Sequence, residues 1–422
     1  MFFLIVLYLM LVLLRPQEYP AFEGVQLPLL PVTLVLALLA WLISYKKSLG
    51  EPQYRLLGAF LVVMMMSVVV NGWVGGALSE LLRFGPVVAA FFILANAIDS
   101  RQRLVFVMGA MVLCATVLAL HGIEQKQTGI GWTGVPLIQD GRIQYVGIFN
   151  DPNDLGMLFV LALPMAMYLS SRGGGFGLLR IFWLSTGLLL LYGIYLTNSR
   201  GALLAVAALL GVWLWRRYGT IVAAVFGSMG LAALLLLPSR LADLSPDEES
   251  ASGRVDAWYE GFQMFISHPL FGVGADNFTD YNHLTAHNSL ILVLAETGFI
   301  GFTLWLGFIG YSFRMMFTVL RHKPELPDAA AVAAWKTERA VAMTLLLSLS
   351  GWLVTAFFLS RSYALVLYLL TALMVAAYAN ARRQFPSLPG FEIGRDWVRL
   401  GMVAAMTVAG LYVVVKVLLA LQ

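Results

Sequence analysis

A histidine stands where a long polar segment meets an apolar run, in the sequence AHNSL at residues 286–290. The run 290–295 is almost wholly apolar and predicts a membrane helix that begins just after His287. Asn288 or Ser289 could cap that helix through a side-chain oxygen. A histidine at the mouth of a membrane helix is placed for acid–base chemistry at a lipid headgroup. The motif alone favours a simpler interpretation, in which the histidine only hydrogen-bonds a loop.

A second motif, NSRG at residues 198–201, joins two apolar runs with almost no loop. Asn198 or Ser199 could cap the following helix, whose first N–H groups and dipole favour an anion. Arg200 adds a full positive charge, so a phosphate would find charge and hydrogen-bond donors together. The alternative is an arginine that extends to the phosphates of surrounding lipids.

The segment 252–267 has the periodicity of an amphipathic helix. Such a helix could lie in the lipid headgroup region on the outward-facing side of the membrane. Its apolar face would comprise Val255, Trp258, Tyr259, Phe262, Phe265 and Ile266. Arg254 falls in the expected first turn, where the helix dipole disfavours a cation. A bound anion would remove that conflict, and pairing with Asp256 or with the preceding acidic residues is the alternative.

Polar residues also gather before the apolar run that starts near residue 154. Arg142 could bind an anion, and Asn150, Asp151 and Asn153 could hydrogen-bond a sugar. These residues also suit a turn that feeds a helix capped by Asn153 or Asp154, and this structural role is favoured. Asp151 and Asp154 could form a calcium site, but their spacing does not match an EF-hand loop.

Two further groups lie on either side of the histidine. Gly272 and Gly274 predict backbone turns, and Asp276 and Asn277 after them offer polar groups to a sugar. Glu296 is an acid inside an apolar run and is therefore a functional candidate, with a buried arginine partner as the alternative. On a helix it would lie about 13 Å below the histidine and on the opposite face, so no direct contact is expected.

The elements that position these residues are expected to be membrane helices. The 422 residues are 60% hydrophobic and 12% charged, whereas soluble proteins are about 25% charged. Several apolar runs approach the roughly 20 residues that span a bilayer. We predict an all-α polytopic membrane protein of 12–14 transmembrane helices, with 1–422 as a single transmembrane domain that contains a large loop at 238–287. The expected spans are 1–14, 27–44, 54–70, 81–98, 104–120, 154–170, 178–197, 201–215, 219–237, 288–319, 338–359, 362–379 and 399–421.

The charges predict the orientation and narrow the chemistry. Basic residues gather in alternate connections, at 46–47, 101–103, 172–180, 216–217, 321–336 and 382–383, which the positive-inside rule places in the cytoplasm. His287 then faces outward. The net charge of +4 suits such loops and membrane lipids rather than a nucleic acid. Cys114 is the one cysteine, so no intramolecular disulfide and no cysteine-based metal site is expected. The residues 1–14 are interpreted as a first span rather than a cleaved signal.

Four motifs together resemble the O-antigen ligase and polymerase superfamily. They are GIFNDPN at 147–153, NSRGA at 198–202, HPLFGVG at 268–274, and HNSL at 287–290 followed by ETG at 296–298. The resemblance spans roughly residues 146–310, and it is strongest to the O-antigen ligases that complete lipopolysaccharide. It implies a metal-independent, cofactor-free, inverting glycosyltransferase in the bacterial inner membrane, with its active site facing the periplasm.

The resemblance also implies substrates and roles. The donor would be a glycan on undecaprenyl pyrophosphate, and the acceptor a sugar of lipid A–core. The family's essential histidine corresponds to His287 and its essential arginines to Arg200 and Arg254. The arginines would hold the pyrophosphate, with Arg142 as a further candidate, and the histidine would act as general base. O-antigen polymerases and protein O-oligosaccharyltransferases share much of this pattern. A lipid-linked glycan transporter is an alternative outside the enzymes, but it should show polar motifs in both halves.

Overall fold

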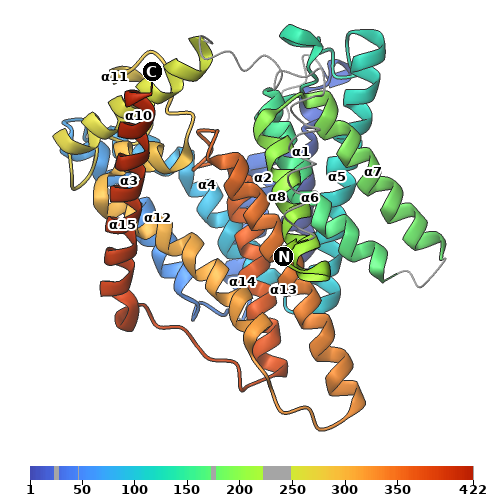
Figure 1. Cartoon of the computed structure of the whole chain (residues 1–422). Coiled ribbons are helices and arrows are strands. Elements are labelled where there is room, and N and C mark those ends of the chain that lie inside the picture. Colours follow the sequence, from blue (N-terminus) through green and yellow to red (C-terminus); the bar gives the residue numbers. More distant parts are fainter. Residues whose placement is uncertain (23–27, 46, 173–176, 222–248, 422) are drawn as a thin grey trace.

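The computed structural model describes residues 1–22, 28–45, 47–172, 177–221 and 249–421, except for the side chains of 216–217 and 249–252. The regular elements of these residues are all helical (Figure 1). The α-helices are α1 (Phe2–Leu14), α2 (Leu29–Ile43), α3 (Pro52–Val70), α4 (Gly76–Ala97), α5 (Arg101–Thr128), α6 (Pro152–Ser171), α7 (Leu178–Thr197), α8 (Arg200–Tyr218), α10 (Glu249–Ser267), α11 (Phe278–Tyr281), α12 (Ser289–Arg321), α13 (Ala329–Ala356), α14 (Leu365–Gln384) and α15 (Ile393–Ala420). The 3₁₀ turns are η1 (Pro16–Glu18), η2 (Pro20–Phe22), η3 (Gln139–Gly141) and η4 (Gly147–Phe149).

Nine helices in the described part of the chain are long and apolar enough to cross a membrane, namely α3 to α7 and α12 to α15. They confirm the all-α polytopic membrane fold. Three more expected spans form the shorter helices α1, α2 and α8. The expected span 219–237, like the first part of the loop 238–287, lies almost wholly outside the described residues.

The bundle has two ends that differ in what they carry. Figure 1 shows α10, α11 and the C-terminus together at the top, and we call this the outer end. The connections from α12 to α13 and from α14 to α15 lie at the bottom, and we call this the inner end. Helices therefore alternate in direction and bring the polar segments around residues 150, 198, 276 and 360 to the outer end.

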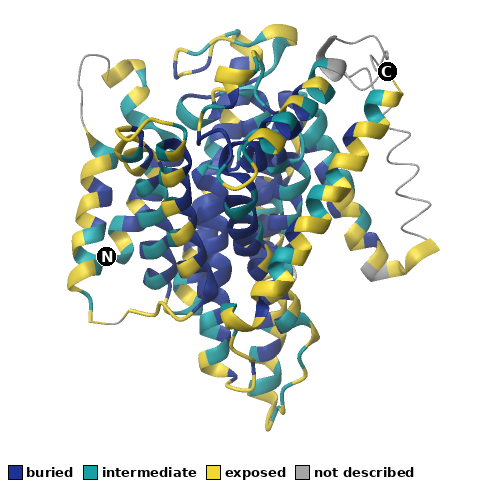
Figure 2. Ribbon diagram, turned by 90° about the vertical axis from the view of Figure 1, so that its left-hand side faces the viewer, coloured by how far each residue is buried: buried dark blue, intermediate teal, exposed yellow. Residues whose placement is uncertain are grey.

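Burial separates central helices from peripheral ones. In the most apolar stretches of α6 and α14, 83% of residues are buried within the protein, whereas the figure for α15 is 11%. Figure 2 shows the buried residues along the middle of the bundle. A helix that is apolar on all sides is expected in such a core. The start of α6 is thus held rigidly at the outer end, and α15 presents an apolar face outward.

Within α12 the helix is broken at Gly298, which has φ 63° and ψ −166°. This region of backbone space is essentially restricted to glycine. The break removes the bonds from residues 299 and 300 back to 295 and 296, and the loop 268–274 replaces them. Phe299 N–H and Ile300 N–H donate to Pro269 O (2.8 Å) and Leu270 O (3.3 Å), while Ala295 O and Glu296 O accept from Val273 N–H (2.9 Å) and Gly274 N–H (3.1 Å). These four bonds thus replace the two that the break removes, as a membrane interior requires.

The amphipathic helix expected at 252–267 is present as α10, but it begins at Glu249. Arg254 therefore lies beyond the first turn, and the predicted conflict with the helix dipole is weaker than expected. The helix packs on the protein through part of the expected face: Trp258 contacts Phe357, and Phe262 contacts Tyr412 of α15, whereas Ile266 is exposed. Its side chains at 258 and 262 are buried.

Candidate functional site

His287 is the last residue before the cap of α12. Asn288 is the cap, and its Oδ1 accepts from the N–H groups of Leu290 (2.9 Å) and Ile291 (3.1 Å). This structure resolves the choice between Asn288 and Ser289 as cap. His287 itself adopts a left-handed backbone conformation with φ 47° and is half-buried. Asn288 is fully buried, so its side chain caps α12 and is not exposed to solvent.

Burial and nearby charges set the ionisation of His287. Burial lowers the pKa of the imidazole below its ordinary value of 6.5, and the positive charges of Arg254 and Arg361 lower it further. Asp151 acts in the opposite direction and raises this pKa. The balance keeps the imidazole neutral and able to accept a proton near pH 7. Charged residues from three other segments, all distant in sequence, thus act on the imidazole of His287.

The start of α6 holds much of the site together. Asp151 is its cap, because Oδ1 accepts from Asn153 N–H at 2.7 Å. The expected caps Asn153 and Asp154 were wrong, because Pro152 occupies the first helical position, where a missing N–H costs nothing. Asn153 instead accepts from Arg142 Nη2 at 3.1 Å, and Arg142 Nε donates to Thr197 O at 2.9 Å. Arg142 therefore ties the start of α6 to the end of α7.

Asp154 is buried and binds an arginine that the sequence interpretation missed. Both its oxygens accept from Arg361, from Nε at 2.5 Å and from Nη2 at 2.6 Å. The calcium site suggested for Asp151 and Asp154 is wrong for this reason, because the arginine occupies both Asp154 oxygens. Arg361 was detectable by the argument already applied to Arg200, since it is a cation at an outer turn between two spans.

The connection from α13 to α14 carries Arg361 and is fixed on the start of α12. Ser289 Oγ donates to Leu359 O at 2.6 Å and accepts from Arg361 N–H at 3.0 Å. Ser362 Oγ donates back to Ser289 O at 2.7 Å. These bonds hold the arginine beside the histidine-bearing loop.

The turn 198–201 lies against the same helix start. Ser199 caps α8 by accepting from Ala202 N–H at 3.4 Å, and Asn198 takes a left-handed conformation with φ 45°. A Cβ placed on Gly156 of α6 would lie 2.9 Å from the Ala202 side chain, so only glycine permits this contact. The turn thereby brings Arg200, which is half-buried, to the α6 region of the outer end.

A cavity of about 480 Å³ opens beside this region. It is lined by Arg83, Ile148, Asn150, Asp276, Phe278, Thr279, Thr285, Leu292, Glu296, Ser360, Arg361, Tyr363 and Ala364. Arg83, which the sequence interpretation also missed, binds Glu80 at 2.6 and 3.1 Å and lies 3.3 Å from Asp276. Its guanidinium lies 5.5 Å from the centre of the Tyr363 ring. The cavity thus offers two arginines and exposed polar groups, as a charged or sugar ligand requires.

Glu296 forms part of the cavity wall rather than pairing with an arginine. Its Oε1 accepts from Phe278 N–H at 3.2 Å, and its Oε2 accepts from Tyr363 OH at 2.7 Å. Asn277, a predicted sugar ligand, donates from Nδ2 to Val273 O at 3.2 Å and so supports the turn around the glycines. Asp276 is exposed, with φ 68°.

Apart from Arg200, which lies at the start of α8, the predicted site residues separate into two groups. His287, Arg254 and Asp151 are brought together, and Asn150 and Asp276 line the adjoining cavity. Asn277 and Asn288 are used mainly in a turn and a cap, and Asn153 and Arg142 form a bridge between helices. Across the described residues, no three His, Cys, Asp or Glu side chains gather as a metal site would need.

Residues 185–306 match the family described as O-antigen ligase. The match covers 122 of the 422 residues and supports a place in the O-antigen ligase superfamily. A search of curated proteins finds no match. The family domain contains Arg200, Arg254 and His287 and supports an enzyme role in the ligase and polymerase superfamily. The start of α6 and Arg361 lie outside the matched residues, so parts of the chain on both sides of the match contribute to the surroundings of His287.

Proposed function

We propose that the protein is an O-antigen ligase of the bacterial inner membrane, with the outer end facing the periplasm. The observation that carries this proposal is the position of His287 directly before the cap of α12, where the charges of Arg254, Arg361 and Asp151 act on its imidazole. The family match supplies the reaction class. The donor is a glycan on undecaprenyl pyrophosphate and the acceptor is lipid A–core.

In the proposed mechanism the arginines bind the donor's pyrophosphate. Arg200 lies at the N-terminus of α8, where backbone N–H groups add to its charge. Arg254, with Arg142 close to the same helix ends, adds further positive charge. These cations stabilise the negative charge that develops on the departing undecaprenyl pyrophosphate.

The histidine then activates the acceptor. A neutral imidazole nitrogen of His287 takes the proton of the acceptor hydroxyl, and the hydroxyl oxygen attacks the anomeric carbon. The bond from that carbon to the pyrophosphate oxygen breaks, and the anomeric configuration inverts. Asp151 stabilises the imidazolium that results, because its negative charge raises the pKa of this group.

The cavity lined by Arg83 and Arg361 is the proposed place for sugars next to the reacting bond. Its volume of about 480 Å³ is in the range of ligand sites. Asn150 and Asp276 line it and are retained as proposed sugar ligands. Asn277 and Asn288 are proposed to act on the substrate only through the turn and the cap that they hold, and Asn153 only through its bond to Arg142.

The decisive experiment combines purified protein with lipid-pyrophosphate-linked glycan and with lipid A–core. Transfer to lipid A–core is expected, and it should persist in EDTA because arginines supply the positive charge in the proposed mechanism. Loss of transfer in EDTA with recovery on adding magnesium would contradict the metal-independent mechanism.

The same assay separates the alternatives. Elongation of the lipid-linked glycan without added lipid A–core would identify a polymerase, and transfer to serine or threonine of a protein would identify a protein O-oligosaccharyltransferase. Movement of the donor across liposomes without any new glycosidic bond would identify a transporter. In cells, deletion of the gene should leave lipopolysaccharide without O-antigen rather than with single repeats.

A further inference from the structure

A second polar cavity lies at the inner end and shares no lining residue with the outer-end cavity. Its volume is about 730 Å³, and it is lined by parts of α3, α12, α14 and α15 together with the connection before α15. Its lining residues are Gly50, Arg55, Arg314, Arg382, Gly390, Phe391, Glu392, Arg395, Asp396 and Arg399. Five of them are arginines and two are acids, so the cavity is strongly positive.

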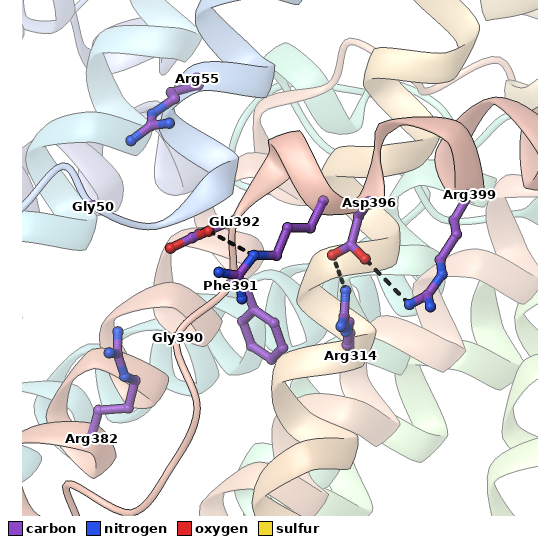
Figure 3. A pocket seen from close by; sticks show the side chains of 10 residues that line it. Gly50, Arg55, Arg314, Arg382, Gly390, Phe391, Glu392, Asp396 and Arg399 are labelled. Atoms are coloured by element: carbon purple, nitrogen blue, oxygen red, sulfur yellow. Dashed lines mark hydrogen bonds and ion pairs between the residues drawn. The ribbon is translucent and has the colours of Figure 1, made fainter.

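The acids at this cavity do not neutralise its arginines. Asp396 is shared, because it binds Arg314 and lies 3.5 Å from Arg399 (Figure 3). Glu392 pairs with Arg395 at 3.3 Å, and Glu51, just outside the lining, pairs with Arg382 at 3.1 Å.

Arg55 stands apart from these pairs. The pairs leave two positive charges in excess, and Arg55 makes no hydrogen bond or ion pair with any residue that the structure describes. Figure 3 shows its guanidinium apart from both labelled acids. The cavity therefore has spare charge and spare N–H donors for an anion.

The helix directions add to this positive field. Both α3 and α15 begin at the cavity, so their first N–H groups and positive dipole ends are at its edge. Arg55 is the fourth residue of α3 and Arg395 is the third of α15. A cation near a helix N-terminus is unfavourable unless an anion offsets its charge. Glu392 does so for Arg395, whereas Arg55 has no ion pair with any described residue. A phosphate group meets this requirement and suits the planar guanidinium.

One face of α15 continues from the cavity as an exposed apolar surface. Arg395 and Arg399 lie on the same face as Val398, Met402 and Met406, at the spacing of adjacent helix turns. Those three apolar side chains are 71%, 53% and 65% exposed. The acyl chain of a lipid could therefore lie along α15 while the lipid headgroup occupies the cavity. A free phosphate has no apolar group to contact this face of α15.

We propose that this inner-end cavity binds the phosphate group of an acidic membrane lipid, with the acyl chains along α15. Basic pockets between membrane helices on the cytoplasmic side recognise such headgroups. The competing explanation is that these arginines only set the orientation of the protein in the membrane. That explanation requires no specific binding and no dependence on a particular arginine.

The test measures lipid binding to the purified full-length protein by native mass spectrometry. The probes are dioleoyl phosphatidylglycerol, dioleoyl phosphatidylcholine and inorganic phosphate. Wild type is compared with Arg55→Gln and with Arg55→Gln/Arg399→Gln. Arg339→Gln is the matched control, because Arg339 is an exposed arginine of α13 that does not line the cavity.

Phosphatidylglycerol should bind wild type and Arg339→Gln alike, and phosphatidylcholine far less. Removing Arg55 should weaken phosphatidylglycerol roughly fivefold, and the double substitution roughly 25-fold, from the usual contribution of one basic residue at a lipid surface. Equal binding by all four proteins would overturn the proposal. Displacement of the lipid by millimolar inorganic phosphate would assign the cavity to the free anion and overturn a lipid as its occupant. Transfer activity is not measured, so either failure leaves the proposed function untouched.

Discussion

The outer and inner ends of the bundle both carry arginines paired with acids, but the two ends differ in backbone conformation. Each end pairs arginines with buried acids: Asp154 and Glu80 have 2% and 7% side-chain exposure at the outer end, and Glu51 has 6% at the inner end. The non-glycine residues with positive φ are Arg15, Asp140, Asn198, Asp276 and His287, and all five lie in outer-end connections. Within the described chain, none lies at the inner end.

This difference indicates how the two ends are used. A left-handed residue other than glycine costs about 1 kcal/mol, and such strain gathers where side chains must be aimed at a ligand. At the outer end the strain is held by caps and by a loop that replaces the broken bonds of α12. At the inner end regular helix starts carry the arginines, which suits binding of an anion rather than catalysis. The distribution of charged residues alone would not distinguish the two ends of the bundle.

The largest effect should come from the histidine. His287→Ala and His287→Gln should each lower kcat by about 100- to 10,000-fold, the usual contribution of a general base. Glutamine can hydrogen-bond the acceptor but cannot take its proton. His283→Gln is the matched control, because His283 is an exposed histidine of the same loop. Glycan transfer and thermal unfolding should be measured for each purified protein. Substantial activity in His287→Gln would mean that the histidine only orients the acceptor.

The next effect concerns an outer-end arginine. Arg200→Ala should reduce transfer by about 100- to 1,000-fold, as loss of one group that stabilises developing charge usually does. Arg200→Lys should recover little, because lysine keeps the charge but not the planar fork. Arg254→Ala should behave similarly. The inner-end control Arg339→Ala should leave transfer unchanged, and full activity in Arg200→Ala would remove Arg200 from the site.

The break in α12 offers a test of the outer-end backbone. A Cβ at Gly298 would lie 2.4 Å from the carbonyl carbon of Leu270, and φ there is positive. Gly298→Ala should therefore destabilise the protein by about 3 kcal/mol or more, from strain and overpacking together. Gly310→Ala is the control in the same helix, because nothing lies within 4 Å of its Cβ. Thermal unfolding in detergent measures both, and equal stabilities would show that α12 does not need its break.

The pH dependence should reflect the charges around the histidine. The base must be neutral, and the pKa of His287 is lowered from 6.5. The ratio kcat/KM, which reports the free enzyme, should fall as the pH is lowered, and the midpoint of this decline should lie below pH 6.5. Asp151→Asn keeps a good cap for α6 but removes a charge that raises this pKa, so the decline should move to lower pH. A decline centred above pH 7 would contradict this electrostatic picture.

The last prediction concerns the side of the membrane on which each end of the bundle lies, and it does not involve activity. In a Cys114→Ala background, Asp280→Cys at the outer end should react with a membrane-impermeant thiol reagent in intact cells. Lys323→Cys at the inner end should react only after the membrane is opened. Both positions are exposed, so access to the reagent depends on the side of the membrane alone. Equal labelling of the two positions in intact cells would contradict the prediction that they lie on opposite sides of the membrane. Labelling of Lys323→Cys alone would show the opposite orientation.

The sequence by itself determined the helices and their order, because apolar runs of membrane length have few alternatives to a helix. It also identified the outer-end motifs around Arg200 and His287. These motifs could be recognised because each is local, combining a cap, a charge and the start of an apolar run.

Only the tertiary structure decided which of these motifs meet. The pairing of Asp154 with Arg361 joins residues 207 positions apart, and no local pattern specifies such a partner. The loop 268–274 and the break at Gly298 could each be seen as turn-forming sequence. Their backbone bonds exist because a helix broken within the bundle must find new partners for its N–H and C=O groups. The distinction between two arginine-rich ends also needed the structure, since it depends on backbone geometry rather than on residue type.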